Sequence, residues 1–172
     1  RKDKTWKYKI ESHETIKYSK YWYNKLKYLH LKTHAEIQKA DEEYGAFLGE
    51  KINNHIIQNN VKCDYISSHG HTIFHQPKNS LTLQIGNGRI ISDITKITTI
   101  NNFRELDVKL KGQGAPLVPI GDSLLFPEYK YCLNLGGFAN ISFKENNKII
   151  AFDICPVNYV LNFLSNKKGL KY

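Results

Sequence analysis

The stretch from Thr33 to Asn60 constrains the fold most, because it has the pattern of one long amphipathic helix. It opens with Thr33-His34-Ala35-Glu36, a capping box in which the threonine hydroxyl accepts from the Glu36 amide while the glutamate reaches back to the cap. Apolar side chains then recur at three- and four-residue spacing: Ile37, Ala40, Tyr44, Leu48, Ile52 and Ile56. We expect this helix to end near Asn59-Asn60 and its polar face to be solvated. That face carries Asp41, Glu42, Glu43 and Lys51.

Strand and helix patterns occur on both sides of that helix. Residues 6–10 (WKYKI) alternate like a strand, and residues 20–31 (KYWYNKLKYLHL) can carry a helix with Tyr21, Leu26 and Leu29 on one side. Downstream, Val61–Ser67 and residues 97–100 (ITTI) have the pattern of short strands.

Glycine and asparagine divide the remaining strand patterns. Residues 81–91 place apolar side chains on both sides of Gly86-Asn87-Gly88, which predicts a hairpin with its turn at that triplet. Residues 131–154 predict a strand, a Gly136-Gly137 loop, a second strand, an Asn146-Asn147 turn and a third strand. The mixture of helices and strands, with glycines at strand ends, predicts an α/β or α+β chain whose site lies in the loops at strand ends.

The composition is that of a soluble globular chain, with 41% hydrophobic and 24% charged residues. No apolar stretch approaches the ~20 residues of a membrane-spanning helix, and no signal segment opens the sequence, so we expect no membrane partner. Cys63, Cys132 and Cys155 have no CxxC spacing, which favours reduced thiols in a cytosolic setting. The chain opens at Arg1 and contains no methionine, so we expect it to be an internal piece of a longer protein.

The net charge of +9 raises the question of a polyanionic partner. Phosphate and base recognition usually depends on arginine, and the only arginines are Arg1, Arg89 and Arg104. Aromatic side chains alternate with lysines in residues 1–32, a pattern that can stack on bases. We favour the alternative in which these aromatics form the apolar face of a surface element, and we expect no nucleic-acid partner.

Three histidines, His69, His71 and His75, lie within seven residues, and such a set can bind zinc. No neighbouring acid or cysteine completes a ligand set. We therefore favour the alternative in which Ser68, His69 and Thr72 offer hydrogen bonds at a strand end, either to a polar ligand or to the protein itself.

Residues 107–116 join one acid to a loop that ordinary residues would not form. Gly112 and Gly114 allow positive φ or a close approach to a ligand, and Pro116 stiffens the exit. Gln113 is then held at the tip, where it offers both a donor and an acceptor. Asp107 can act as a general base or bind sugar hydroxyls, and the alternative is a helix-starting or solvated aspartate.

Three further patterns are weaker by themselves. Gln84 sits just before the glycine turn that ends its strand. Gly136-Gly137 follows a strand, and exposed amides at such a turn can bind a phosphate, although neither a Rossmann nor a P-loop glycine pattern is present. Asp153 ends a strand ahead of Pro156, a position suited to a metal ion or a hydroxyl.

Seven motifs occur in one order along the chain. They are Ser68-His69-Gly70-His71-Thr72, Phe74-His75-Gln76-Pro77, Leu83-Gln84-Ile85-Gly86, Phe103-Arg104-x-x-Asp107, Gly112-Gln113-Gly114-Ala115-Pro116-Leu117-Val118-Pro119, Asn134-x-Gly136-Gly137-x-Ala139-Asn140 and Phe152-Asp153-x-x-Pro156-x-Asn158. Together they closely resemble the anhydro-N-acetylmuramic acid kinase family, and the resemblance runs from about Tyr18 to Asn162.

The resemblance implies an α/β chain that is part of a two-domain sugar kinase/heat-shock 70/actin-like (ribonuclease H-like) fold, whose domains flank a cleft. Residues 1–130 would be mainly the N-terminal, sugar-binding domain, incomplete at its N-terminus. Residues 131–172 would start a truncated C-terminal domain. The resemblance also implies an ATP- and Mg²⁺-dependent kinase of the bacterial cytoplasm that is often dimeric and serves peptidoglycan recycling. Such an enzyme converts 1,6-anhydro-N-acetylmuramic acid, ATP and water to N-acetylmuramate 6-phosphate and ADP.

The resemblance also implies roles for single residues. The acid matching Asp107 is the general base that activates water against the anomeric carbon. The side chains implied to line the sugar pocket are Ser68, His69, Gln84, Arg104 and Gln113. Arg104 is suited by its charge to the lactyl carboxylate of muramic acid. Gly136, Gly137 and Asn140 match the phosphate-binding turn, and Asp153 matches an acid that can hold Mg²⁺ through water.

The sequence departs from the family pattern in three places. Asn102 replaces an aspartate, Lys111 replaces the first glycine of Gly-Gly-Gln-Gly, and Cys155-Pro156-Val157-Asn158 replaces Gly-Pro-Gly-Asn. We expect Lys111 to strain its loop if that position needs positive φ.

Two of the family's motifs, an N-terminal Gly-Thr-Ser phosphate loop and a C-terminal glycine-rich adenosine site, do not occur in these 172 residues. We therefore expect the chain alone not to turn over ATP. Two alternatives stay open: a kinase of the same superfamily with another substrate, and a non-catalytic basic binding module. The salt dependence of binding distinguishes the basic binding module from a sugar kinase, because nucleic-acid binding weakens steeply as the salt concentration rises.

Overall fold

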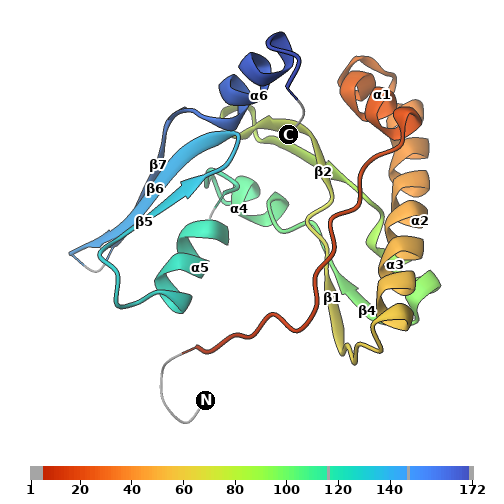
Figure 1. Ribbon diagram of the computed structural model, residues 1–172, viewed down its shortest axis with the longest axis horizontal. Helices are drawn as coiled ribbons and strands as arrows, with labels where there is room; N and C mark the ends of the chain where they lie inside the picture. Colours follow the sequence, from red (N-terminus) through yellow and green to blue (C-terminus); the bar gives the residue numbers. More distant parts are fainter. Residues whose placement is uncertain (1–5, 116, 147, 171–172) are drawn as a thin grey trace. The chain divides into compact units, whose positions relative to one another are not determined.

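The computed structural model describes residues 6–115, 117–146 and 148–170 (Figure 1). Helices and strands are mixed along the chain, as the sequence predicts. The chain divides into two compact units, one formed by Ile10–Ala115 and the other containing residues 6–9 and 117–170. No helix among these residues is long and apolar enough to cross a bilayer.

Two helices open the first unit where the sequence predicts them, but Trp22 and not Tyr21 is buried beside Leu26 and Leu29. α1 spans Lys20–Tyr28, is followed by a short 3₁₀ turn (η1, Leu29–Leu31), and leads into α2, which spans His34–Gln58. The predicted capping box is present. The Glu36 amide donates to Thr33 Oγ1 over 3.3 Å, and the Thr33 amide donates to Glu36 Oε2 over 2.9 Å. Residues 6–10 form no strand, so the strand prediction there is wrong; these residues are exposed.

The strands of the first unit form two pairs. β1 (Tyr65–Ser67) runs parallel to β4 (Thr98–Ile100), which confirms the strand at 97–100 and the last part of the one at 61–67. β2 (His71–Gln76) and β3 (Leu81–Ile85) are antiparallel and are joined by a 3₁₀ turn (η2, Pro77–Asn79).

The hairpin predicted around Gly86-Asn87-Gly88 is wrong. Residues Gly88–Thr95 form helix α3, and Asn87 is its N-cap, because Asn87 Oδ1 accepts from the amides of Arg89 and Ile90. β3 instead pairs with β2, which precedes it in the sequence. An asparagine before a helix and an asparagine in a tight turn look alike in sequence, because the same side chain serves both.

Asp41 is not a solvated residue of the α2 polar face, as the sequence predicts, but ties that helix to the segment between β3 and α3. Its Oδ1 accepts from the Gly86 amide over 2.8 Å and its Oδ2 accepts from Asn87 Nδ2 over 3.0 Å. Helix α2 approaches the same segment closely at Gly45, where a Cβ would lie 2.9 Å from both the backbone nitrogen and oxygen of Asn87. Helices α2 and α3 lie against each other (Figure 1).

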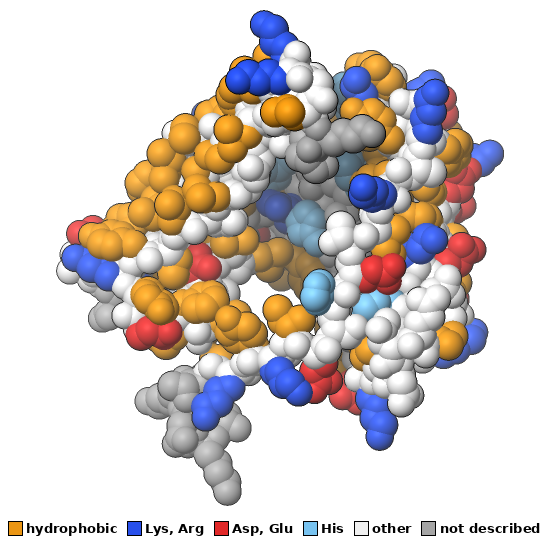
Figure 2. Space-filling view, in the orientation of Figure 1, with side chains coloured by type: hydrophobic (Ala, Val, Ile, Leu, Met, Phe, Trp, Pro, Cys, Tyr) orange, Lys and Arg blue, Asp and Glu red, His pale blue; other side chains and the backbone are white. Residues whose placement is uncertain are grey.

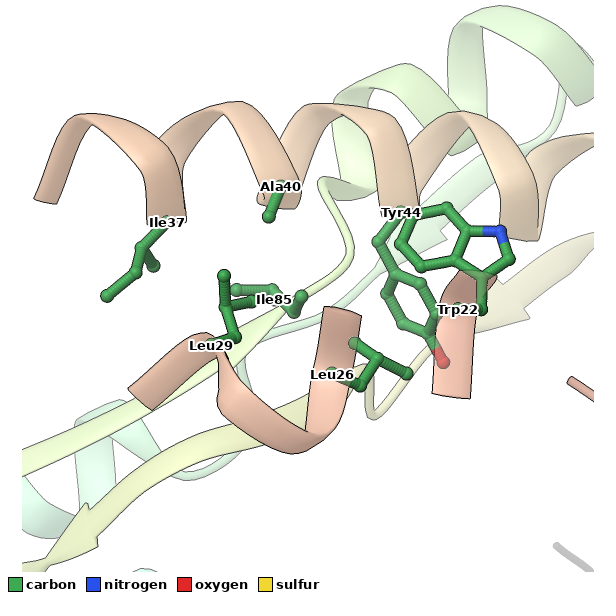
Figure 3. Close-up of a cluster of buried hydrophobic side chains, with 7 residues drawn as sticks. All are labelled: Trp22, Leu26, Leu29, Ile37, Ala40, Tyr44 and Ile85. Carbon is green, nitrogen blue, oxygen red and sulfur yellow. The ribbon is translucent and has the colours of Figure 1, made fainter. Parts of the chain in front are cut away.

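A core of buried side chains joins α1, α2 and β3 (Figure 3). It contains Trp22, Leu26, Leu29, Ile37, Ala40, Tyr44 and Ile85. The rings of Trp22 and Tyr44 meet edge to face with their centroids 5.2 Å apart. Burial, followed by the hydrogen bond with the Tyr18 hydroxyl at 2.6 Å, raises the pKa of Tyr44 well above its ordinary value, so its hydroxyl stays protonated. Because β3 contributes Ile85 to this core, its register is fixed, and with it the side chains on its other face.

The second unit is an antiparallel sheet with a helix at each end of its sequence. The elements are α5 (Leu117–Leu125), β5 (Tyr131–Leu135), β6 (Phe138–Glu145), β7 (Lys148–Pro156) and α6 (Asn158–Lys167), with strand order β5-β6-β7. The three predicted strands and the Gly136-Gly137 turn are confirmed, while Asn147 of the predicted second turn lies outside the described residues. Ser142 Oγ on β6 donates to Asp122 Oδ2 on α5 over 2.6 Å.

Large apolar side chains are exposed on this second unit. Leu133 on β5, Phe152 on β7 and Phe163 on α6 are 58%, 54% and 64% exposed. Hydrophobic side chains gather over the sheet in the space-filling view (Figure 2). Monomeric soluble proteins seldom expose so much contiguous apolar surface.

Candidate active site

Asp107 lies on the short helix α4 (Glu105–Lys109) and is held by the glycine loop that follows it. The Gly114 amide donates to Asp107 Oδ2 over 2.6 Å, and the Gly112 amide donates to the Asp107 carbonyl over 2.7 Å. The other carboxylate oxygen, Oδ1, receives no hydrogen bond from any residue that the structure describes. One oxygen is therefore anchored by the backbone while the other is free to accept a proton or a hydroxyl.

The loop needs small residues because it passes so close to α4. A Cβ at Gly112 would overlap the Asp107 carboxylate, and one at Gly114 would lie 2.6 Å from Val108 Cγ2. Gly114 has φ +67°, one of the two reasons that the sequence offers for a glycine there, and the close neighbour of Gly112 within the chain is Asp107. Pro116, predicted to stiffen the loop, lies outside the described residues.

Lys111 adopts φ +69°, which answers the question raised by its replacement of a glycine. The left-handed region costs a non-glycine residue free energy, because its Cβ crowds the neighbouring carbonyl. The position therefore does require positive φ, and the lysine is strained there.

Arg104 links three segments of the first unit at the start of α4. Its Nε donates to His69 Nε2 and its Nη1 donates to the Gly114 carbonyl, both over 2.8 Å. His69 Nδ1 lies 3.1 Å from the Gly70 carbonyl, which fits a neutral ring with its proton on Nδ1. The structure thus brings His69 and Arg104 together with the loop that holds Asp107.

Gln84 lies near the end of β3, and Ser68 follows the end of β1. Gln84 Nε2 donates to Thr82 Oγ1 over 2.9 Å, whereas Gln84 Oε1 is buried and accepts no hydrogen bond within the described part of the chain. Ser68 is 8% exposed, and its amide donates to the Ile100 carbonyl at the end of β4 over 2.9 Å. Gln113 is exposed at the tip of the glycine loop.

The three clustered histidines have different surroundings. His69 accepts from Arg104, His75 Nδ1 lies 3.3 Å from Thr82 Oγ1, and the ring of His71 packs edge to face on Tyr44. Burial lowers the pKa of His71. No group of three His, Cys, Asp or Glu side chains that could hold a metal ion occurs in residues 6–115, 117–146 or 148–170. Two of these histidines, His69 and His75, therefore make hydrogen-bonding contacts within the first unit, while His71 makes a ring contact.

In the second unit, the Gly136-Gly137 turn is joined to the start of α6. The amides of Val157 and Asn158 donate to the carbonyls of Gly137 and Gly136 over 2.9 and 3.2 Å, and Asn158 Nδ2 donates to the Leu135 carbonyl over 3.1 Å. The turn is therefore held by hydrogen bonds to its carbonyl groups.

A polar row crosses the sheet beside that turn. Asn140 on β6 is opposite Asn134 on β5 and opposite Asp153 on β7. Directly opposite residues of antiparallel strands share a face, so these three side chains lie on one face of the sheet. The predicted residues Asn140 and Asp153 are thereby brought together.

Reasoning from the sequence missed Thr82 and gave His75 no separate role. Thr82 and Gln84 are two residues apart on a strand, a spacing that puts both on one face and could have pointed to Thr82. For His75 the sequence holds no such sign, because its neighbours depend on how β2 pairs with β3.

Comparison with known proteins shows which family the chain is similar to. Residues 20–172 match the model of the family described as anhydro-N-acetylmuramic acid kinase. The chain is 43% identical over 112 residues to the anhydro-N-acetylmuramic acid kinase of Pseudomonas fluorescens, covering 62% of this chain and 31% of that protein. It is 39% identical over 145 residues to that of Crocosphaera subtropica, covering 76% and 38%. For that of Pelagibacter ubique the identity is 40% over 121 residues, covering 65% and 32%.

The chain thus spans about a third of the length of the curated relatives that it matches. The matched segment includes both the glycine loop with Asp107 and the sheet with the Gly136-Gly137 turn. The chain belongs to the anhydro-N-acetylmuramic acid kinase family.

Proposed function

We propose that this chain is part of an ATP-dependent kinase that hydrolyses the 1,6-anhydro bridge of 1,6-anhydro-N-acetylmuramic acid and phosphorylates O6. The product is N-acetylmuramate 6-phosphate. In this proposal the reaction serves peptidoglycan recycling in the cytoplasm. The observation that carries this proposal is the carboxylate of Asp107, with one oxygen anchored by the Gly114 amide and the other free, in a chain of this family.

Asp107 acts in this proposal as the general base. Its free Oδ1 takes a proton from a water molecule, whose oxygen bonds to the anomeric carbon as the bond from that carbon to O6 breaks. O6 then forms a bond to the γ-phosphorus of ATP, and ADP leaves. Because the base, the sugar and the phosphate must be aligned, the backbone anchor on Oδ2 contributes by fixing where Oδ1 points.

The sugar is held by Ser68, His69, Gln84, Arg104 and Gln113. Arg104 uses Nε and Nη1 within the protein and keeps its remaining N–H groups for the lactyl carboxylate of the substrate. The exposed Gln113 offers both a donor and an acceptor to sugar hydroxyls.

ATP is bound in part by Gly136, Gly137 and Asn140, and Mg²⁺ by Asp153 through water. The row formed by Asn140 and Asp153 fits a Mg²⁺ ion, which prefers few protein oxygens and keeps several waters. When bound, Mg²⁺ would neutralise negative charge on the phosphates of ATP. We also propose that the chain contains parts of two domains. Residues 1–130 are mainly in the sugar-binding domain, and residues 131–172 are the start of the second domain.

The exposed apolar side chains on β5, β7 and α6 support the view that this second domain has further layers in a longer protein. A homodimer is part of the proposal because members of the family often form one. The 172 residues alone are not expected to turn over ATP, and detectable phosphorylation by this chain would overturn that expectation.

Phosphorylation of 1,6-anhydro-N-acetylmuramic acid by the longer protein tests the proposal, with Asp107→Asn beside the wild type. The asparagine keeps an oxygen that can accept from the Gly114 amide, so the fold is retained while the base is lost. We expect the rate to fall by about two orders of magnitude or more. Asp93→Asn, an exposed aspartate on α3, is the matched control and should leave the rate unchanged. If the wild-type protein binds ATP but does not phosphorylate this sugar, the proposed substrate is wrong, while the assignment to the kinase superfamily stands.

A further inference from the structure

A β-bulge brings four polar side chains onto one face of the β2–β3 hairpin. The pairing partners are Thr72 with Gln84 and His75 with Thr82, and the register shifts between Thr72 and Phe74. In a regular strand, residues three apart point to opposite faces, so Thr72 and His75 would be separated. The extra residue, Ile73, corrects the alternation and puts both side chains opposite Thr82 and Gln84.

The other face of the hairpin belongs to the core. Ile85 is buried there, and Ile73, Phe74 and Leu83 pack against the same cluster. The polar face is therefore turned away from the core and cannot slip by one residue without burying Gln84 and exposing Leu83.

Hydrogen bonds run in one direction along this polar face. Gln84 Nε2 donates to Thr82 Oγ1 over 2.9 Å and lies 3.4 Å from Thr72 Oγ1. Thr82 Oγ1 lies 3.3 Å from His75 Nδ1. Because Thr82 already accepts from Gln84, its single hydroxyl proton is available for Nδ1, provided that the ring is neutral and carries its own proton on Nε2.

The surroundings of His75 favour that neutral ring. Partial burial, followed by the charge of Arg104, lowers the pKa of His75. The ring also packs on the glycine loop, since a Cβ at Gly114 would lie 3.1 Å from His75 Cε1. His75 thus lies beside both the residue that anchors Asp107 and the threonine that orients Gln84.

We propose that His75 and Thr82 are positioning residues that fix the side-chain amide of Gln84, with Nε2 bound to threonine hydroxyls and Oε1 left to accept from a sugar hydroxyl or N–H group. Gln84 Oε1 is buried and has no partner among the described residues, and an unpaired buried acceptor is costly until a donor reaches it. Only an amide in this orientation offers an acceptor there; the flipped amide would offer a donor. The part of the proposal that concerns the sugar rests on the proposed function.

Nuclear magnetic resonance of the ligand-free chain tests the positioning by itself. Long-range ¹⁵N–¹H spectra of the imidazole should show His75 neutral at pH 7, with its proton on Nε2. Thr82→Val should change the Nδ1 resonance and shift the side-chain amide signals of Gln84, and Thr82→Ser, which keeps the hydroxyl, should restore both. A charged His75, or a proton on Nδ1, overturns the proposal.

Calorimetric titration of the longer protein with 1,6-anhydro-N-acetylmuramic acid tests the consequence for binding. Thr82→Val should weaken binding by about tenfold, the value of one ordinary hydrogen bond, and Thr82→Ser should restore it. The control is Thr99→Val, which removes the hydroxyl of a strand threonine in β4 that donates to the Ile97 carbonyl. Unchanged affinity in Thr82→Val overturns the role of Thr82 in binding. If the wild type does not bind the sugar while the imidazole spectra are as expected, the proposed substrate fails and the positioning of Gln84 stands.

Discussion

The backbone amide of Gly114 donates to Oδ2 of Asp107 over 2.6 Å, so the loop that follows α4 folds back to hold the acid of that helix. Arg104 donates to the carbonyl of the same glycine, which fixes the peptide groups on both sides of Gly114. The glycines of this loop are therefore needed first for the acid and its neighbours within the chain. The sequence predicts that they allow positive φ or a close approach to a ligand, and the positive φ is present at Gly114.

Gly112→Ala should destabilise the chain through Asp107. The new methyl group would overlap the carboxylate and push it from its bond with Gly114, at a cost of about 1–3 kcal/mol. In an Asp107→Ala background the clash is absent, so the same substitution should cost much less. Denaturant unfolding of the four proteins of this cycle measures the coupling, which should be about 1 kcal/mol or more. Equal costs in both backgrounds would remove the argument. Gly121→Ala on α5, where nothing lies within 4 Å of the new Cβ, is the control.

Lys111→Gly should stabilise the chain. Lys111 has φ +69°, and relieving a left-handed non-glycine residue gains about 1 kcal/mol, partly offset by the greater freedom of glycine when unfolded. Among the described residues its side chain makes only a long contact of 3.4 Å with Ser80 Oγ, so little else is lost. The unfolding midpoint in urea measures the change, and Lys109→Gly within α4 should instead destabilise. A lower midpoint for Lys111→Gly would contradict the strain.

Gly45→Ala should destabilise the chain although alanine favours helices by about 1 kcal/mol over glycine. At Gly45 the new methyl group meets the backbone of Asn87 at 2.9 Å, which cannot move without shifting the start of α3. At Gly49 the nearest atom is Cδ1 of Ile94 at 3.0 Å, which can rotate away, and Cβ of Ile94 at 3.1 Å must shift only slightly. Thermal unfolding should therefore rank the variants with Gly45→Ala clearly below Gly49→Ala. The reverse order would show that α2 and α3 are packed differently.

The capping box of α2 should make stability depend on pH in the acid range. The amide of Thr33, and then its hydroxyl, hold the pKa of Glu36 below its ordinary value of 4.5. A depressed folded-state pKa contributes stability above pH 4.5 that is lost as the pH falls through the lower folded-state value. Unfolding followed between pH 7 and pH 3 should show that Glu36→Gln has a flatter acid limb than the wild type. Glu50→Gln, an exposed glutamate further along α2, should keep the wild-type slope.

Local patterns in the sequence determined those features of this protein that neighbouring residues decide among themselves. The capping box at Thr33, the three strands of residues 131–156 and the positive φ of Gly114 each follow from a few adjacent side chains. The motifs around Asp107 and Gly136-Gly137 likewise indicated the family that the comparison then showed.

Only the tertiary structure decided which distant groups meet. The sequence indicates a surface residue at Asp41, but α2 lies against Gly86 and Asp41 binds its amide. The sequence also indicates a return strand at Ile90-Ile91, but Asn87 caps a helix there. The partnership of His75 with Thr82 depends on one bulged residue, which inverts the side-chain alternation without any local sign. Close packing and hydrogen bonding between segments select one arrangement from several that the local sequence permits, because their free energies are gained only when those segments come together.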